Sequence, residues 1–193
     1  MNSVFISDKK DFEIIYNDML TQFPKCELKT FDFFLKLLNS SNYKCELFKI
    51  NNQNIGYIFY YLSDFIWVDY LAIFKNFQSK GFGTQILNHL FNKYKKLNGV
   101  YFEVEPENEK DLNTQKRLQF YKQKIKCVET HTKYFMPNDF GLYEMKLLYK
   151  PLNSKSLDDE NILNNIEETF SVLYSYITNV DEIFNKIKHH LLK

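Results

Sequence analysis

The chain has 193 residues, 45% of them hydrophobic and 25% charged, which is enough to bury a core and most simply forms one domain with room for an appendage. Its formal net charge of +1 gives no general field for nucleic acid or for a membrane, so we expect neither as a partner. The three cysteines, Cys26, Cys45 and Cys127, are far apart in the sequence, which disfavours a disulfide framework or a zinc cluster. The chain shows neither a signal-like start nor an apolar run of about 20 residues. Together these features favour a cytoplasmic protein.

The first part of the chain predicts a strand, two helices and two further strands. In chain order we expect a strand at Val4 to Ile6, a helix capped by Ser7-Asp8, a helix around Phe31 to Leu38, and strands at Cys45 to Ile50 and Ile55 to Leu62. Phe12, Ile15 and Met19 share one face of the first helix, as core-facing residues do. Asn51 to Asn54 has the composition of a turn and joins the last two strands.

A strand, a glycine-containing turn and an amphipathic helix follow. Phe65 to Phe74 is rich in aromatic and branched residues, and the helix after the turn has an apolar stripe that we expect to end at Asn98-Gly99. Lys93, Lys95 and Lys96 are expected on its solvated face. The turn, Gln-Ser-Lys-Gly-Phe-Gly at 78–83, removes side chains near the helix amides and so favours an anion. A plain structural turn fits the same two glycines.

The usual phosphate-binding motifs do not fit this turn. A dinucleotide fingerprint would need a third glycine where the chain has Ile86. A nucleoside triphosphate loop would need Gly-Lys followed by Ser or Thr, which is missing here.

The remaining segments predict a mixed fold and a helical tail. We expect a strand at Val100 to Glu105, a helix at Asn113 to Lys124, and strands at Cys127 to Tyr134 and Leu142 to Tyr149. Ser156 to Asp159 is similar to a capping box, and apolar residues then follow at helical spacing with a break near Asn179 to Asp181. Residues 151–193 are therefore expected as a helical C-terminal extension. The apolar stripe of this extension is expected to pack on its own domain, to form a homodimer contact or to cover a binding groove as a lid. The pattern leaves these three alternatives open.

The segment around the turn resembles the acetyl-CoA site of the GNAT N-acetyltransferase superfamily. The family signature, Arg or Gln, two residues, Gly, one residue, then Gly or Ala, is matched by Gln78, Gly81 and Gly83. Leu71-Ala72-Ile73 stands where the family strand commonly has Leu-Ala-Val, and Tyr121 stands where family members commonly have a tyrosine whose hydroxyl reaches the coenzyme's sulfur.

The resemblance implies a fold, a domain and a site. It implies a mixed, mainly antiparallel sheet of six to seven strands flanked by helices, with residues 1–150 forming the GNAT-like domain. It implies that the strand backbone pairs with the pantetheine amides and that the turn amides hold the pyrophosphate. The implied coenzyme-binding residues are Leu71, Ala72, Ile73, Gln78, Ser79, Lys80, Gly81, Phe82, Gly83 and Thr84.

The expected reaction is acetyl transfer from acetyl-CoA to an amine by direct attack. Backbone amides near Ala72 to Phe74 would polarise the thioester carbonyl, and Tyr121 would donate to the sulfur. Strand alternation places Glu103 and Glu105 on one face as candidate general bases, with Glu103 inside the strand. Asp69 is a further carboxylate that would bind the acceptor. The chain shows no metal-ligand pattern, so no metal is expected.

Several residues depart from the family pattern. Ser79 stands where Gly is frequent, Ile125-Lys126 stand where Gly-Phe is common, and Thr114 occupies the place of a usual Asn. The changed Gly-Phe position and the extra helical tail motivate an alternative, a catalytically inactive acyl-CoA-binding or partner-binding module. Within the enzyme class we expect an amine-bearing small molecule as acceptor, and peptide or protein N-acetylation stays open because it needs an open groove.

Overall fold

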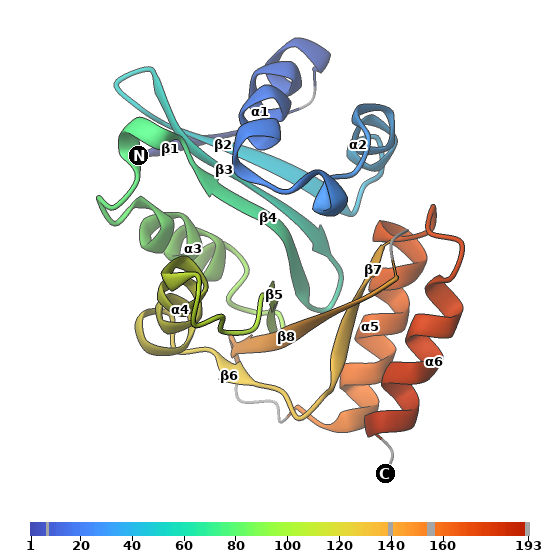
Figure 1. Cartoon of the computed structure of the whole chain (residues 1–193). Coiled ribbons are helices and arrows are strands. Elements are labelled where there is room, and N and C mark those ends of the chain that lie inside the picture. The colour runs from blue at the N-terminus through green and yellow to red at the C-terminus, as the bar shows by residue number, and fades with distance from the viewer. Residues whose placement is uncertain (7, 139–140, 154–156, 192–193) are drawn as a thin grey trace. The chain divides into compact units, whose positions relative to one another are not determined.

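The computed structural model describes residues 1–6, 8–138, 141–153 and 157–191 (Figure 1). These residues form two compact units, Met1–Lys95 and Lys96–Lys193.

The first unit is an antiparallel sheet with helices on both sides. The strands pair in the order β1, β2, β3, β4, and Figure 1 shows α1 and α2 on one side of them and α3 on the other. The elements are β1 (Asn2–Phe5), α1 (Lys9–Gln22), α2 (Phe31–Leu38), β2 (Tyr43–Ile50), β3 (Gln53–Leu62), β4 (Ile66–Ile73) and α3 (Phe82–Lys93), with 3-10 turns at Lys25–Glu27 and Lys75–Phe77.

Aromatic side chains fill both sides of this sheet. On β3, Phe59 packs against Phe34 of α2 with ring centroids 5.3 Å apart, while the next residue, Tyr60, packs against Tyr94 at 5.8 Å on the side of α3. Successive strand residues point to opposite faces, and both faces of β3 are buried. The continuous apolar run of β3 follows from this two-sided burial.

The second unit is organised around its longest strand, β8. One edge of β8 pairs with β5, and its other edge pairs with β6 and then β7, all antiparallel. The elements are β5 (Gly99–Val104), α4 (Leu112–Gln119), a π-helical turn (Phe120–Lys124), β6 (Val128–Glu129), β7 (Tyr134–Asn138), β8 (Gly141–Pro151), α5 (Asp159–Leu173) and α6 (Val180–Leu191).

The predicted elements are present with shifted ends. Asp8 caps α1 by accepting from Asp11 N–H at 2.9 Å, and Asp158 caps α5 by accepting from Asn161 N–H at 2.8 Å. Ser7 and Ser156, which also belonged to the expected caps, lie outside the described residues. The strand expected at 127–134 is wrong for most of its length, because only Val128–Glu129 pairs there and β7 begins at Tyr134. The described residues hold eight strands, more than the six to seven expected.

The predicted end of α3 is also wrong, and Gly99 has a different purpose. The helix stops at Lys93, with Tyr94 as its C-cap. Gly99 begins β5, where an added Cβ would lie 2.2 Å from Cζ of Tyr149. The glycine is needed for a close approach to this ring rather than for a left-handed helix end.

The C-terminal helices pack within the second unit. Phe170 of α5 lies 6.0 Å from the Tyr134 ring of β7, and Phe135 of β7 lies 6.4 Å from His190 of α6. Asn165 of α5 donates to the Tyr101 hydroxyl of β5 at 3.0 Å. Packing on the chain's own fold therefore accounts for the apolar stripe of this tail, while a homodimer contact and a lid stay predictions.

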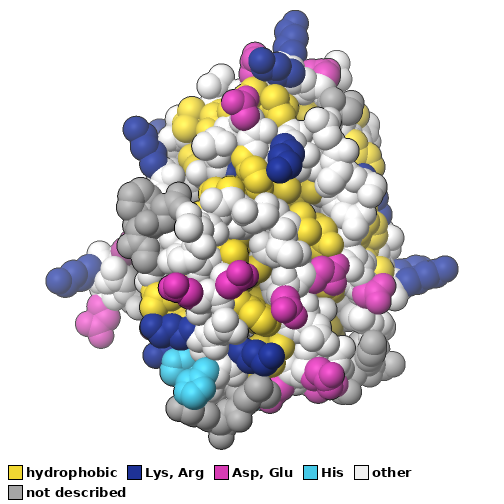
Figure 2. All heavy atoms as spheres, turned by 90° about the vertical axis from the view of Figure 1, so that its right-hand side faces the viewer, with side chains coloured by type: hydrophobic (Ala, Val, Ile, Leu, Met, Phe, Trp, Pro, Cys, Tyr) yellow, Lys and Arg dark blue, Asp and Glu magenta, His cyan; other side chains and the backbone are white. Residues whose placement is uncertain are grey.

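Charged side chains of both signs are interspersed with hydrophobic ones on the face drawn in Figure 2. This mixture agrees with the balanced composition of 25 Lys and Arg against 24 Asp and Glu. Among the described residues, no helix combines the length and the apolar character needed to cross a membrane.

Candidate active site

A bulge in β4 lies at Asp69. In the pairing with β3, Phe59 lies opposite Tyr70 and Tyr60 lies opposite Val68, so Asp69 is the extra residue. Bulges of this kind re-aim neighbouring side chains and often lie beside functional sites.

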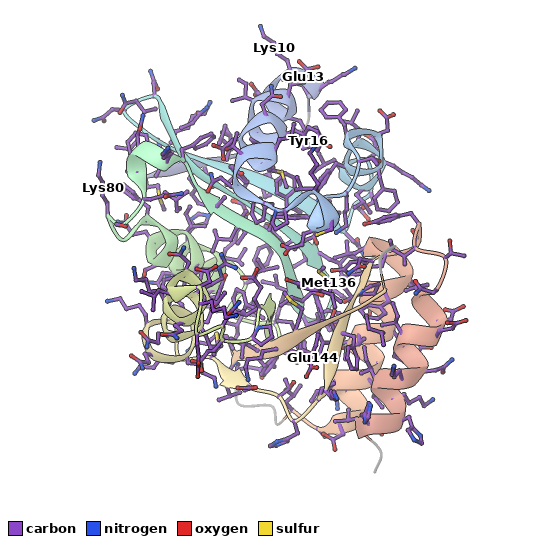
Figure 3. All side chains as sticks on the ribbon, viewed as in Figure 1. Lys10, Glu13, Tyr16, Lys80, Met136 and Glu144 are labelled. Carbon is purple, nitrogen blue, oxygen red and sulfur yellow. The ribbon has the colours of Figure 1, made fainter. Side chains whose placement is uncertain are left out.

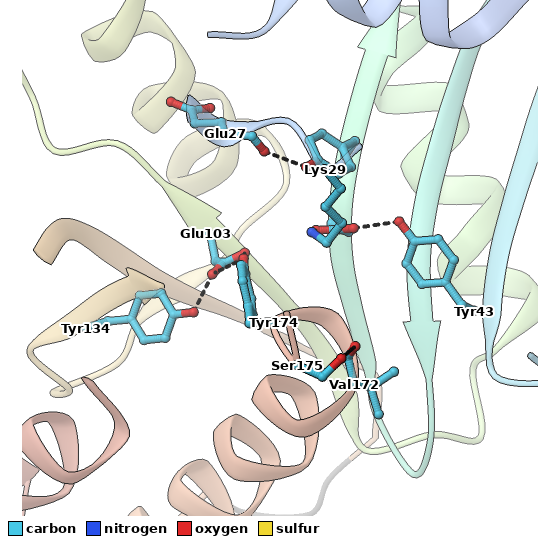
Figure 4. A network of polar contacts seen from close by, with 10 residues as sticks. Glu27, Lys29, Tyr43, Glu103, Tyr134, Val172, Tyr174 and Ser175 are labelled. Carbon is cyan, nitrogen blue, oxygen red and sulfur yellow. Dashed lines mark hydrogen bonds and ion pairs between the residues drawn. The ribbon is translucent and has the colours of Figure 1, made fainter. Parts of the chain in front are cut away.

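Two neighbours in the first unit hold the Asp69 carboxylate. The side chain is 2% exposed, Oδ1 accepts from Lys29 Nζ at 2.8 Å, and Oδ2 accepts from the Tyr43 hydroxyl at 2.5 Å (Figure 4). Lys29 is equally buried and also lies 5.1 Å from the centroid of the Tyr70 ring. A buried carboxylate balanced by a buried ammonium offers little attraction to an incoming cation. This arrangement disfavours the predicted acceptor-binding role of Asp69.

The last residues of β4 carry the backbone expected to face the coenzyme. Ala72 is buried, whereas Leu71 and Ile73 are half-buried. The Phe74 N–H donates to the Ile55 carbonyl at 3.0 Å, so it is already used within the sheet. The expectation that Phe74 helps to polarise a thioester is therefore disfavoured. By antiparallel alternation the Ala72 N–H also faces β3, opposite Tyr57, and Ile73 remains as the predicted donor.

The turn between β4 and α3 is left-handed at two positions. Ser79 has φ 61° and Gly81 has φ 81°. Gly81 is the N-cap of α3, and a Cβ added to it would meet nothing within 4 Å. Glycine adopts this conformation without strain and leaves the space in front of the helix amides open. The start of α3, with Phe82, Gly83 and Thr84 as its first residues, therefore has the shape and the dipole direction of an anion cradle.

Gln78 fastens this turn to the end of β4. Its Nε2 donates to the Ile73 carbonyl at 3.1 Å and to Oε1 of Gln22 at 3.1 Å. Lys80 projects at the tip of the turn, and its Nζ donates to the Asn76 carbonyl at 2.8 Å (Figure 3). Gln78 was predicted to bind the coenzyme. Its side chain instead stabilises the shape of the turn through hydrogen bonds to protein groups.

An ion pair between Lys93 and a buried carboxylate holds the other end of α3. Lys93 Nζ lies 2.9 Å from Oε1 of Glu46, whose side chain is 1% exposed, and the Tyr60 hydroxyl donates to the same oxygen at 2.6 Å. Burial opposes ionisation of Glu46, but the hydrogen bonds from Lys93 and Tyr60 leave its pKa below the ordinary value. Lys93 is exposed, as predicted, but its ammonium also ties α3 to β2, which the sequence did not indicate.

Tyr121 lies in the π-helical turn of the second unit. Its ring packs 4.8 Å from Phe102 of β5 and 5.2 Å from Phe120. Burial, followed by the nearby Cys127, raises the pKa of the phenol above its ordinary value. The hydroxyl therefore keeps its proton at neutral pH and can act as a donor. Single π-helical turns inside helices often occur at functional sites.

Glu103 lies on β5 between two phenols. Tyr134 of β7 donates to Oε1, and Tyr174 donates to Oε1 at 3.1 Å and to Oε2 at 2.9 Å (Figure 4). Tyr101, two residues earlier, also faces α5 through Asn165. The predicted alternation of Tyr101 and Glu103 onto one face of the strand is confirmed.

Glu105 lies just beyond β5 and is ion-paired. Its Oε2 contacts the Arg117 guanidinium of α4, and its side chain is 20% exposed. The Arg117 guanidinium therefore already occupies this carboxylate. Of the two predicted bases, the local geometry thus favours Glu103.

The thiols offer little nucleophilic character. All three cysteines are free, and Cys45 and Cys127 are buried. Burial raises the pKa of Cys45 well above its ordinary value and that of Cys127 to about 12, so these thiols stay protonated at neutral pH. In the described part of the chain, no group of three or more His, Cys, Asp or Glu side chains is arranged to hold a metal ion.

The sequence did not reveal two of these partners. Lys29 was not recognised as the partner of Asp69, because the two are 40 residues apart and nothing local links them. Tyr174 follows Phe170 by four residues on the buried face of the tail. A tyrosine on an apolar stripe implies a buried hydroxyl that needs a partner, and that signal was available.

Comparison with known proteins identifies the family. Residues 12–120 match the model of the acetyltransferase (GNAT) family. The chain belongs to the GNAT acetyltransferase family. It is 29% identical over 116 residues to YjbC of Bacillus subtilis (strain 168), whose name assigns it as an acetyltransferase, and this match spans 58% of the chain and 57% of YjbC.

Solved structures of GNAT proteins share the fold. A protein of Bacteroides thetaiotaomicron assigned to the GNAT family aligns with TM-score 0.76 and 19% identity over 90% of this chain and 98% of its own. Arabidopsis thaliana Naa50, in complex with the bisubstrate analogue CoA-Ac-MVNAL, aligns with TM-score 0.58 and 17% identity over 78% of this chain and 99% of its own. The predicted fold class, a mixed sheet flanked by helices, is confirmed.

Proposed function

We propose that this GNAT protein transfers an acetyl group from acetyl-CoA to an amine by direct attack. The observation that carries the proposal is the turn before α3, where Gly81 leaves the helix amides uncovered and Ser79 shares the left-handed conformation. The diphosphate of coenzyme A is an anion suited to such amides. The residues present therefore fit acetyl-CoA, and they form the motif shared with the family.

The donor side would use β4 and the turn. The backbone of Leu71 and Ile73, on either side of Ala72, would pair with the pantetheine amides, and the turn from Ser79 to Thr84 would hold the diphosphate. A side chain at position 81 would meet nothing within 4 Å, but it would strain the left-handed N-cap that presents the α3 amides. Naa50 was solved with a coenzyme A conjugate, which supports coenzyme binding by this fold.

The transfer step needs an acid for the leaving sulfur. The amine nitrogen attacks the thioester carbonyl, the carbon–sulfur bond breaks, and the thiolate takes up a proton. Tyr121 is the proposed donor, because burial keeps its phenol protonated. The protonated state of Cys45 and Cys127 disfavours a covalent acyl-thiol intermediate.

The amine must lose a proton to become an amide. Glu103 is the proposed base, either directly or through a water, because it is a strand carboxylate oriented by two phenols. The acceptor is proposed as a small amine in the cytoplasm. A peptide acceptor is the second candidate, since the Naa50 analogue joins coenzyme A to a peptide.

Thiol release from acetyl-CoA tests the proposal. The protein is mixed with acetyl-CoA and, separately, with spermidine, lysine methyl ester, an aminoglycoside and a short peptide with a free N-terminus. We expect release that depends on one of these amines, together with an acetylated product by mass spectrometry. Tight acetyl-CoA binding with no transfer to any amine would instead favour the inactive binding module.

A further inference from the structure

The C-terminal helices contribute a hydroxyl to the proposed base. Tyr174, the C-cap of α5, lies beyond the region matched by the family model, which ends at residue 120. It is 3% exposed, and its hydroxyl lies within hydrogen-bonding distance of both Glu103 oxygens, at 2.9 and 3.1 Å. A buried phenol that lacks a partner is costly, so this contact fixes both the tail and the carboxylate.

We propose that Tyr174 is a positioning residue that sets the orientation and the ionisation of Glu103. The inference rests on the proposed function, in which Glu103 is the base. The helical tail is then part of the catalytic machinery, in addition to covering β7.

Hydrogen-bond chemistry gives the tail this effect. A donor to a carboxylate stabilises its charged form and fixes its rotamer, and hydrogen bonds to charged groups are stronger than neutral ones. Tyr134 of β7 supplies a second phenol to the same carboxylate.

A second tail contact offers a matched control. Asn165 of α5 donates to the Tyr101 hydroxyl of β5 at 3.0 Å and does so without involving Glu103. Asn165→Ala weakens the docking of the same helix on the same strand. If Tyr174 only docked the tail, Tyr174→Phe and Asn165→Ala would affect Glu103 alike.

The test is carbon-13 NMR of the full chain labelled at the glutamate carboxyl carbons. The resonance missing in Glu103→Gln assigns Glu103, and its titration is followed in wild type, Tyr174→Phe and Asn165→Ala. Tyr174→Phe keeps the ring that packs 5.4 Å from Phe170. We expect the proton affinity of Glu103 to rise about tenfold in Tyr174→Phe, moving the midpoint about one pH unit higher. In Asn165→Ala the midpoint stays at the wild-type value.

An unchanged midpoint in Tyr174→Phe, or equal shifts in both variants, overturns the inference. A second measurement needs no variant of Tyr174 and uses wild-type protein labelled at the tyrosine Cζ carbons. The chemical shifts of Tyr174 and Tyr134 should change with pH at the titration midpoint of Glu103. Failure of either to follow Glu103 also counts against it.

The proposed function fails separately. If Glu103→Gln retains wild-type turnover with the amine found by thiol release, Glu103 is not the base, whatever the NMR titration gives. If Glu103→Gln loses turnover while the Tyr174→Phe midpoint is unchanged, the base role stands and the inference about Tyr174 is wrong.

Discussion

Replacing Lys93 by Met should destabilise the unit that carries the proposed coenzyme turn. Lys93 keeps α3 on β2 through Glu46, whose side chain is 1% exposed. Breaking a fully buried ion pair costs about 3–5 kcal/mol. Because the Lys93 side chain is 30% exposed, water replaces part of the lost interaction, and we expect a loss of about 2–3 kcal/mol in the free energy of unfolding at pH 7.5.

The pH dependence gives this prediction its sign. In wild type the pKa of Glu46 is lowered, so its contribution is present above the ordinary glutamate value and is lost as pH falls through the lowered one. In Lys93→Met, burial still disfavours the charged form of Glu46, but the stabilising ammonium is gone. Protonation of Glu46 therefore removes part of the destabilisation of this variant. The destabilisation should therefore be smaller at pH 5 than at pH 7.5.

Urea unfolding at pH 7.5 and at pH 5 measures this loss in free energy. The proteins compared are wild type, Lys93→Met and the control Lys95→Met. Lys95 is exposed and two residues away, so its replacement should change the free energy of unfolding by less than about 0.5 kcal/mol. The reasoning is refuted if the two variants are equally stable at pH 7.5, or if the loss in Lys93→Met grows in acid.

Three further changes test the local arguments. Tyr121→Phe should lower turnover about tenfold or more while leaving the acetyl-CoA dissociation constant nearly unchanged; equal turnover in steady-state kinetics would remove the proposed acid. Lys29→Met should cost about 3 kcal/mol by urea unfolding, because it strands the buried Asp69, whereas Lys25→Met, at an exposed position, should be nearly neutral. Gly99→Ala should cost about 1–3 kcal/mol by thermal and urea unfolding, since its Cβ would lie 2.2 Å from a ring carbon of β8, and a neutral result would contradict the close approach.

Local patterns predicted most of the elements. The helical spacing of Phe12, Ile15 and Met19 placed all three in the core with no exposed surface, and the turn at Asn51-Asn52 has both residues left-handed. These features depend on neighbours in the chain, and the sequence shows such neighbours directly. The strand at 127–134 failed because β6 and β7 are defined by pairing with β8, which lies later in the chain.

The site was predictable only in part for the same reason. The turn could be located because its motif is contiguous, from Gln78 to Gly83. The partners of the candidate carboxylates were not predictable, because Lys29 reaches Asp69 across 40 residues and Tyr174 reaches Glu103 across 71. Such pairs follow from the folded topology, and alternation along one strand cannot identify them.

Calorimetric titration of acetyl-CoA into wild type, Gly81→Val and Asn52→Val tests the central claim most directly. Asn52 also has a positive φ, 63°, in the β2–β3 turn, so it controls for backbone strain. The account predicts wild-type affinity in Asn52→Val and a loss of about tenfold or more in Gly81→Val, because only Gly81 is the N-cap of the helix that presents its amides to the coenzyme. Equal affinities in all three proteins, or no binding by wild type, would contradict it.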